Sequence, residues 1–253
     1  MSRAIRILAG LTLAVLLCLP VLAQADSHIV TKSTTSSFVM MGDTIPASEM
    51  TSDIWMGKDQ AAMNMDTAKV IIDLTKSMMY MIDHNTKSYT EMPIGSMADM
   101  MGAMGMDAED EESAAALEMM KNMMGSMKFT VTPTEETQKI GDYNCKRFDV
   151  AMEMMMMKMN SQVWASTDIQ CDMDVYFRLS NAMMAMFPGF EAALTEWKKI
   201  EGFPVLQIAT LDMMGQPVET RSELVSVEEA AAPAGTYDLP ADYKKDDLKT
   251  MGN

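Results

Sequence analysis

The stretch KVIIDLTKSMMYMIDHNTKSYTEMP, residues 69–93, decides the fold class. It contains three short β-branched or apolar segments, Lys69–Leu74, Met78–Ile82 and Ser88–Met92. Turn-forming residues separate them, among them Asp83-His84-Asn85, and Pro93 stops the last segment. Short strands at intervals of about ten residues, with no crossover helix between them, predict an antiparallel meander.

Similar segments continue outward on both sides. The further strands are expected at residues 28–41, 49–56, 61–65, 129–132, 143–154, 162–167, 205–211 and 218–227. Two helices are expected at 172–186 and 190–199, separated by Pro188-Gly189. The sequence therefore predicts an α+β, mainly antiparallel fold in one domain over residues 26–245, followed by a flexible tail at 246–253.

Residues 94–127 form a methionine-rich insertion that we expect to be helical. An acidic run, Asp107–Glu112, precedes a segment from Ala114 to Met127. Negative charge favours the start of a helix at that point. The apolar positions of this segment recur at three- and four-residue steps, so the sequence predicts an amphipathic helix whose apolar face is mostly methionine.

The first 25 residues have the pattern of a secretory signal peptide. Arg3 and Arg6 precede the apolar run Ile7–Leu22, and Ala23-Gln24-Ala25 forms a small-x-small cleavage site. Cys18 raises the alternative of lipid attachment, but Leu17 stands where a lipobox has a small residue. We therefore predict cleavage after Ala25 and a periplasmic protein that is not an integral membrane protein.

The composition excludes several classes of protein. The chain has 253 residues and a formal net charge of −16, which argues against binding to nucleic acid or to an anionic membrane surface. The hydrophobic fraction of 48% is typical of a globular protein. Methionine stands out, because 34 residues, about one in seven, are of this type.

Two cysteines remain after cleavage at Ala25, and we expect them to pair. In an oxidising compartment two cysteines usually form a disulfide. A hairpin centred on Lys158 places Cys145 opposite Cys171 and Met152 opposite Trp164. A metal or redox pair is the rival interpretation, although the chain has no C-x-x-C and only two histidines.

The order of several segments resembles a known family. These are residues 68–74, 78–81, 140–146, Val163-Trp164, Gly202-Phe203-Pro204 and 239–243. The chain is similar to the periplasmic domain-of-unknown-function 4412 family, whose fold is expected to resemble the outer-membrane lipoprotein carrier LolA. The resemblance covers most of residues 28–245. It implies a curved β-sheet, an open half-barrel, with helices covering the concave face, and it supplies no catalytic residues.

No motif for catalysis or cofactor binding is present. The sequence lacks a nucleophile elbow, a P-loop, a dinucleotide fingerprint and H-E-x-x-H, so we expect no enzymatic activity and no cofactor. Asp107–Glu112 lacks the spacing of an EF-hand, and calcium binding there is a minor alternative. His84 lies in a predicted turn, where we expect it to be exposed rather than a ligand.

Three interpretations of the methionines stay open. The first is packing alone, because methionine fills irregular space. In the second, the methionine-faced helix covers a hydrophobic ligand, lined by Met120, Met123, Met124, Met127, Phe148, Val150, Met152 and Trp164. In the third, thioethers bind copper(I) through Met97, Met100, Met101, Met104 and Met106, with a second cluster at 154–159.

The function that these observations favour is non-enzymatic. We predict an exported binding or carrier protein for a hydrophobic small molecule or lipid, such as the acyl chain of a lipoprotein. The alternative is a methionine-rich periplasmic copper(I)-binding protein.

Overall fold

The computed structural model describes residues 25–246 except 41, 95–114, 116–117, 120–121, 123–125, 155–156, 170, 185–189 and 214–215. Its first eight strands are β1 (Asp26–Thr35), β2 (Phe38–Met40), β3 (Asp43–Ile45), β4 (Ser48–Met56), β5 (Gln60–Asn64), β6 (Ala68–Asp73), β7 (Met78–Asp83) and β8 (Ser88–Pro93). The other strands are β9 (Lys128–Ile140), β10 (Tyr143–Met154), β11 (Met157–Ser166), β12 (Phe203–Met213), β13 (Gln216–Ala230) and β14 (Lys244–Lys245). Two helices, α4 (Met173–Met184) and α5 (Phe190–Trp197), lie between β11 and β12.

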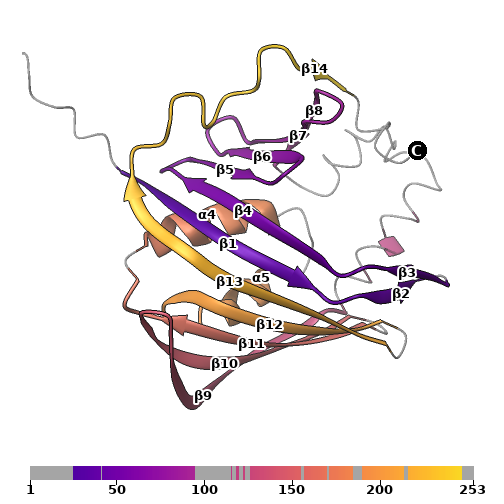
Figure 1. The fold of residues 1–253 in the computed structure, drawn as a ribbon, viewed down its shortest axis with the longest axis vertical. Coiled ribbons are helices and arrows are strands. Elements are labelled where there is room, and N and C mark those ends of the chain that lie inside the picture. The colour runs from indigo at the N-terminus through magenta and orange to yellow at the C-terminus, as the bar shows by residue number, and fades with distance from the viewer. Residues whose placement is uncertain are drawn as a thin grey trace, which may run out of the picture.

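Twelve of these strands form one open sheet. Their order is β14-β8-β7-β6-β5-β4-β1-β13-β12-β11-β10-β9, and β2 and β3 form a separate hairpin between β1 and β4. Neighbouring strands are antiparallel except β14 and β8. The first strand therefore lies near the middle of the sheet, between β4 and β13 (Figure 1). The predicted fold class, a mainly antiparallel curved sheet, is confirmed.

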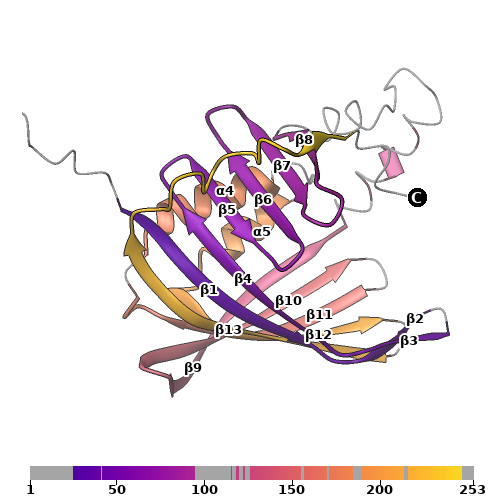
Figure 2. The same cartoon turned by 45° about the horizontal axis from the view of Figure 1, so that its top comes forward.

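Helices α4 and α5 pack against the concave face of this sheet (Figure 2). The carboxylate of Asp172 caps α4, because its Oδ1 accepts hydrogen bonds from the backbone N–H of Asp174 at 3.1 Å and of Val175 at 3.0 Å. Leu179 of α4 is buried with Ile29 and Ile72 of the sheet in one hydrophobic cluster. Both helices were predicted, and their observed bounds lie within the expected ranges.

A second cluster covers the part of the concave face formed by β9, β10 and β11. Phe148 and Val163 are fully buried there with Val150 and Ile200. Trp197 of α5 packs against this cluster. The backbone N–H of Val131 on β9 donates a 3.0 Å hydrogen bond to Glu196 Oε2 on α5. Burial of these side chains, each stabilising by about 1.5–3 kcal/mol, therefore holds α5 on the sheet.

The last described residues cover part of the convex face. Tyr237, Leu239 and Tyr243 pack against a buried cluster that contains Ala62, Ile71, Tyr80 and Ile82. Strand β14 then continues the sheet beside β8. Residues 231–246 are therefore an integral part of the fold.

The position of His84 differs from the predicted one. Its imidazole is partly buried, with Nδ1 2.8 Å from the hydroxyl oxygen of Tyr243 and the two rings edge to face at 5.7 Å. The prediction that His84 is exposed was wrong, because Tyr243, which is 159 positions later in the sequence, packs against its ring.

The predicted hairpin register was also wrong. The β10–β11 pairing ends at Met154 opposite Met157, so Met152 lies opposite Met159 and Trp164 lies opposite Arg147. Relative to the predicted centre at Lys158 this is an odd shift in pairing, so Met152 and Trp164, which were predicted to face each other, lie on opposite faces of the sheet. The run of methionines at 154–157 offers no alternation that fixes a register from sequence.

Both cysteines are free thiols, which contradicts the predicted disulfide. With the observed register, Cys145 is opposite Gln138 of β9, and Cys171 lies beyond the end of β11, just before α4. Cys145 is buried in a cluster with Trp164, whereas Cys171 packs against the cluster that contains Ile29.

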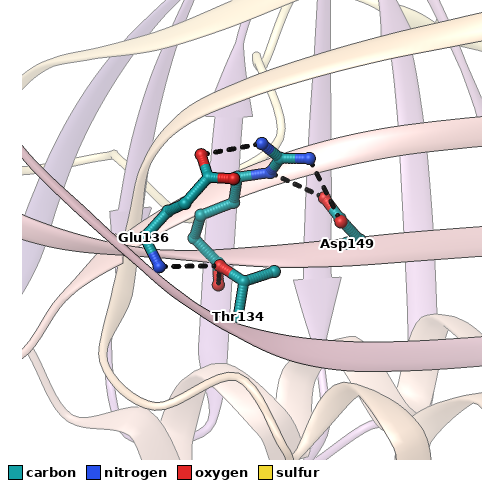
Figure 3. A network of polar contacts seen from close by, with 4 residues as sticks. Thr134, Glu136 and Asp149 are labelled. Atoms are coloured by element: carbon teal, nitrogen blue, oxygen red, sulfur yellow. Dashed lines mark hydrogen bonds and ion pairs between the residues drawn. The ribbon is translucent and has the colours of Figure 1, made fainter.

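A polar network stabilises the bulge where β9 and β10 pair (Figure 3). Arg147 contacts Asp149 through Nε at 2.8 Å and Nη2 at 3.1 Å, and Glu136 through Nη1 at 2.8 Å. Thr134 Oγ1 donates to the carbonyl oxygen of Arg147 at 2.9 Å and accepts from the N–H of Glu136. Strand β9 is much longer than the four residues expected, because an edge strand tolerates Pro133 and the charged residues that follow it.

Most of the methionine-rich insertion lies outside the described residues, and so do residues 1–24 of the predicted signal peptide and residues 247–253. In the part of the chain that the structure describes, no helix is long and apolar enough to cross a membrane.

Candidate functional site

An apolar cavity of about 260 Å³ lies between the concave face and the two helices. The strands β1, β4, β5, β6, β12 and β13 and the helices α4 and α5 all contribute to its wall. Its lining residues are Ile29, Thr31, Ile54, Met56, Ala61, Met63, Val70, Ile72, Tyr176, Leu179, Trp197, Phe203, Pro204, Val205, Leu206, Gln207, Ser222 and Leu224. The cavity therefore lies where the two halves of the sheet meet under the helical cover.

The strand register brings the apolar lining together. Ile29 of β1 is opposite Ile54 of β4, which is opposite Met63 of β5, which in turn is opposite Val70 of β6. Residues directly opposite each other share a face of an antiparallel sheet. One row across four strands thus forms the floor of the cavity.

Aromatic and aliphatic side chains form the cover. Tyr176 and Leu179 project from α4, and Trp197 lies at the end of α5. The ring of Tyr176 meets Phe203 edge to face, with 6.0 Å between the centroids. Since this contact joins α4 to the start of β12, the cover is attached to the sheet beside the cavity.

None of the described residues that line the cavity has a charged side chain. The polar residues of the lining are Thr31, Gln207 and Ser222 on the sheet and Tyr176 on α4. The cavity therefore favours uncharged apolar groups, with hydrogen-bonding positions on one part of its wall.

A second depression is larger but differs in character. It measures about 480 Å³ and is lined by residues of β9, β10 and β11, among them Lys139, Lys146 and the buried Cys145, and by Glu201 from the segment between α5 and β12. Burial raises the pKa of the Cys145 thiol, which keeps it protonated and weakly nucleophilic. This depression therefore has neither the apolar lining of a lipid site nor an activated nucleophile.

The described members of the predicted ligand-lining set do not line this cavity. Met120, Met123 and Met124 lie outside the described residues. Phe148 and Val150 are buried in the cluster beside α5, whereas Trp164 belongs to the cluster with Cys145. None of these three, nor Met127 or Met152, is among the cavity lining. Their contact with a ligand stays a prediction.

The cavity residues could have been found in part from the sequence. Ile29, Ile54 and Ile72 each occupy an apolar position in a predicted strand. What was missing was the pairing of β1 with both β4 and β13, which brings Ile29 and Ile54 into one cluster with Leu224. Pairing between strands that are about 200 positions apart produces no pattern in the local sequence of either strand.

The predicted copper ligands and the acidic run belong to the methionine-rich insertion. Met97, Met100, Met101, Met104 and Met106, and the acidic run Asp107–Glu112, lie outside the described residues. Among the residues that are described, no group of three or more His, Cys, Asp and Glu side chains is placed to hold a metal ion.

Comparison with known proteins identifies a family but no curated relative. A family model described as a domain of unknown function (DUF4412) matches residues 36–243. No curated protein sequence matches the chain.

Two solved structures show low similarity. A structure of PNGF-II shares 11% identity with a TM-score of 0.37, and the match covers 88% of this chain and 31% of that one, so the chain spans about a third of that protein. A putative outer-membrane lipoprotein-sorting protein domain from Vibrio parahaemolyticus shares 6% identity with a TM-score of 0.31, covering 85% of this chain and 89% of the other.

Proposed function

We propose that this chain, which belongs to the family of the domain of unknown function DUF4412, is an exported, non-enzymatic binding or carrier protein for an acyl chain. The observation that carries the proposal is the apolar cavity between the concave face and helices α4 and α5. An uncharged pocket enclosed by aliphatic and aromatic side chains binds ligands mainly by removing their apolar surface from water.

The volume of the cavity limits the ligand. Pockets for drug-sized molecules measure about 300–1,000 Å³. At about 260 Å³ the cavity is just below this range, so it accommodates one chain, or part of one, rather than several. Longer or multiple chains require that the helical cover moves away from the sheet.

The sequence supports export and a role without catalysis. The signal-peptide pattern at residues 1–25 supports a periplasmic location, where a lipid needs a protein carrier to cross water. In the described part of the chain, the cavity lining includes no histidine, cysteine or carboxylate that could act as an acid, base or nucleophile.

Filling the cavity tests the proposal. The full chain after signal cleavage is titrated with an environment-sensitive fluorescent acyl probe, and the wild type is compared with Val70→Phe. Val70 lines the cavity, so the larger ring occupies ligand space and we expect probe affinity to fall by at least about tenfold.

The matched control is Val225→Phe. Val225 is 60% exposed and does not line the cavity, so the same substitution leaves binding unchanged. Absence of probe binding to the wild type, or equal binding to the wild type and Val70→Phe, contradicts the proposal.

A further inference from the structure

We infer that the ligand carries an uncharged hydrogen-bonding head group, such as an acyl ester or amide, and that this head lies against Thr31, Gln207 and Ser222. This inference rests on the proposed acyl-chain function and adds the chemical class of the head group. We call these three residues the polar end of the cavity.

The register of three strands makes the polar end contiguous. Gln207 of β12 is directly opposite Ser222 of β13, and Ser222 is opposite Ser33 of β1. Ser33 Oγ donates a hydrogen bond to Ser222 Oγ at 3.0 Å. Thr31 is two residues before Ser33 on the same face, so its hydroxyl lies next to this pair. The polar residues of the sheet wall are thus grouped rather than scattered.

The polar end borders the apolar floor directly. Thr31 is opposite Leu224, and two residues before it on the same strand is Ile29. A ligand that lies along β1 therefore passes from isoleucine and leucine contacts to hydroxyl and amide contacts. An amphiphile matches this order, with its chain over Ile29 and its head at Thr31.

Two side chains of the polar end, Thr31 and Gln207, have donors and acceptors that a ligand can use. Within the part of the chain that is described, neither the Thr31 hydroxyl nor the Gln207 amide is hydrogen-bonded to another residue. A hydroxyl both donates and accepts, and an amide supplies two donors and a carbonyl acceptor. Ester and amide heads offer the complementary groups.

Among the described residues, no Lys or Arg lines the cavity at the polar end. The basic residues next to it in sequence are Lys32 and Arg221, and strand alternation directs both to the opposite face. Both are also paired there, Lys32 with Glu49 at 2.9 Å and Arg221 with Glu223. An ionised carboxylate buried at the polar end thus loses water without gaining a counter-ion, which disfavours a free fatty acid.

A competition experiment tests the head-group class. The full chain after signal cleavage, loaded with the fluorescent acyl probe, is titrated with a monoacylglycerol and with a fatty acid of the same chain length, at a pH where the acid is ionised. We expect the monoacylglycerol to displace the probe at a concentration at least about tenfold lower.

Two variants of Gln207 locate the effect. Gln207→Lys places a cation at the polar end and should reduce or reverse the preference for the monoacylglycerol over the fatty acid. Gln207→Leu should weaken binding of the monoacylglycerol without strengthening binding of the fatty acid. Gln162→Lys is the control, because Gln162 is exposed on β11 and does not line the cavity. It should leave the preference unchanged.

Equal displacement by the two competitors, or an unchanged preference in both Gln207 variants, overturns the inference and leaves the proposed function standing. If the probe itself does not bind, the proposed function fails. The two failures are therefore distinguishable.

Discussion

The hydroxyl of Tyr237 donates a hydrogen bond to Asp26 Oδ2 over 2.8 Å, although 211 positions separate the two residues. The bond joins the first residue of β1 to the segment that covers the convex face. Gly57 lies against the same pair, and a Cβ at that position would be 3.0 Å from Asp26 Oδ1 and 3.2 Å from the Tyr237 hydroxyl oxygen. The contact therefore fixes the covering segment at the middle of the sheet.

Tyr237→Phe should destabilise the protein by about 1 kcal/mol, because it removes this hydrogen bond and leaves Asp26 without its partner. Burial and the neighbouring Asp26 raise the pKa of Tyr237, so the phenol remains a donor at neutral pH. Urea unfolding measures the loss, with Tyr143→Phe as a control at a half-buried tyrosine elsewhere. Equal midpoints for wild type and Tyr237→Phe would contradict the prediction.

Asp73→Asn should lower the free energy of unfolding by about 3 kcal/mol, since Asp73 is 1% exposed and its carboxylate accepts several hydrogen bonds. It accepts from Lys76 Nζ at 2.8 Å, Gln60 Nε2 at 2.9 Å and Thr75 Oγ1 at 2.6 Å. The substituted amide retains one acceptor and presents N–H groups to these donors. Thermal unfolding at neutral pH, compared with exposed Asp66→Asn, measures the difference.

The same carboxylate predicts sensitivity to acid. Burial alone raises the pKa of Asp73, but the hydrogen bonds from Lys76, Thr75 and Gln60 outweigh it and hold the pKa well below its ordinary value. Its stabilising contribution is therefore complete above the unfolded pKa of 3.8 and is lost as the pH falls below that value. Asp73→Asn should flatten the acid limb of a plot of unfolding free energy against pH, and parallel curves would refute this.

The stabilising contribution of His28 should have the opposite pH dependence and decrease as the pH rises through neutrality. Its ring stacks on Trp55 at 4.1 Å, with Nε2 3.0 Å from Asp53 and Nδ1 3.2 Å from Glu228. Burial lowers the pKa of His28, but the two carboxylates outweigh it and raise the pKa above 6.5. The contribution of the protonated ring is complete below pH 6.5 and disappears as the pH rises through the higher folded-state pKa.

His28→Gln tests this dependence, because glutamine keeps polar contacts but does not titrate. Unfolding free energies of both proteins should converge as the pH rises from about 6 to about 9. A constant difference between them across that interval would show that His28 contributes only packing.

Thiol titration distinguishes the observed cysteines from the expected disulfide. Unfolded, unreduced protein should release two thiols per chain to an aromatic disulfide reagent, because Cys145 and Cys171 are both free. In the native state both should react slowly, since burial raises the pKa of each thiol. Finding no thiol after unfolding without a reductant would reinstate the disulfide.

The local pattern of the sequence was enough to predict most of the longer strands and the helices α4 and α5. Alternating apolar residues bounded by turns predicted β6, β7 and β8, and periodicity interrupted at Pro188-Gly189 predicted α4 and α5. These preferences arise within a few residues, from steric limits on the backbone and from which face is buried. The order of short motifs was likewise enough to predict the family.

The cavity could not be predicted in the same way. Its floor depends on β1 pairing with β4 on one side and β13 on the other, and its lining excludes Phe148 and Val150, which were predicted to contact the ligand. The residues next to Phe148 and Val150 in the sequence do not indicate that α5 covers these two side chains.

By itself, the sequence determined that the chain forms a mainly antiparallel sheet with two helices, because each residue's preference for strand, turn or helix acts over short distances. Only the tertiary structure decided the register of the β10–β11 hairpin, the free state of Cys145 and Cys171, and which side chains enclose the cavity. Those features depend on which distant strands pair and on which face each residue then shows, and in a chain this rich in methionine several registers bury apolar surface equally well.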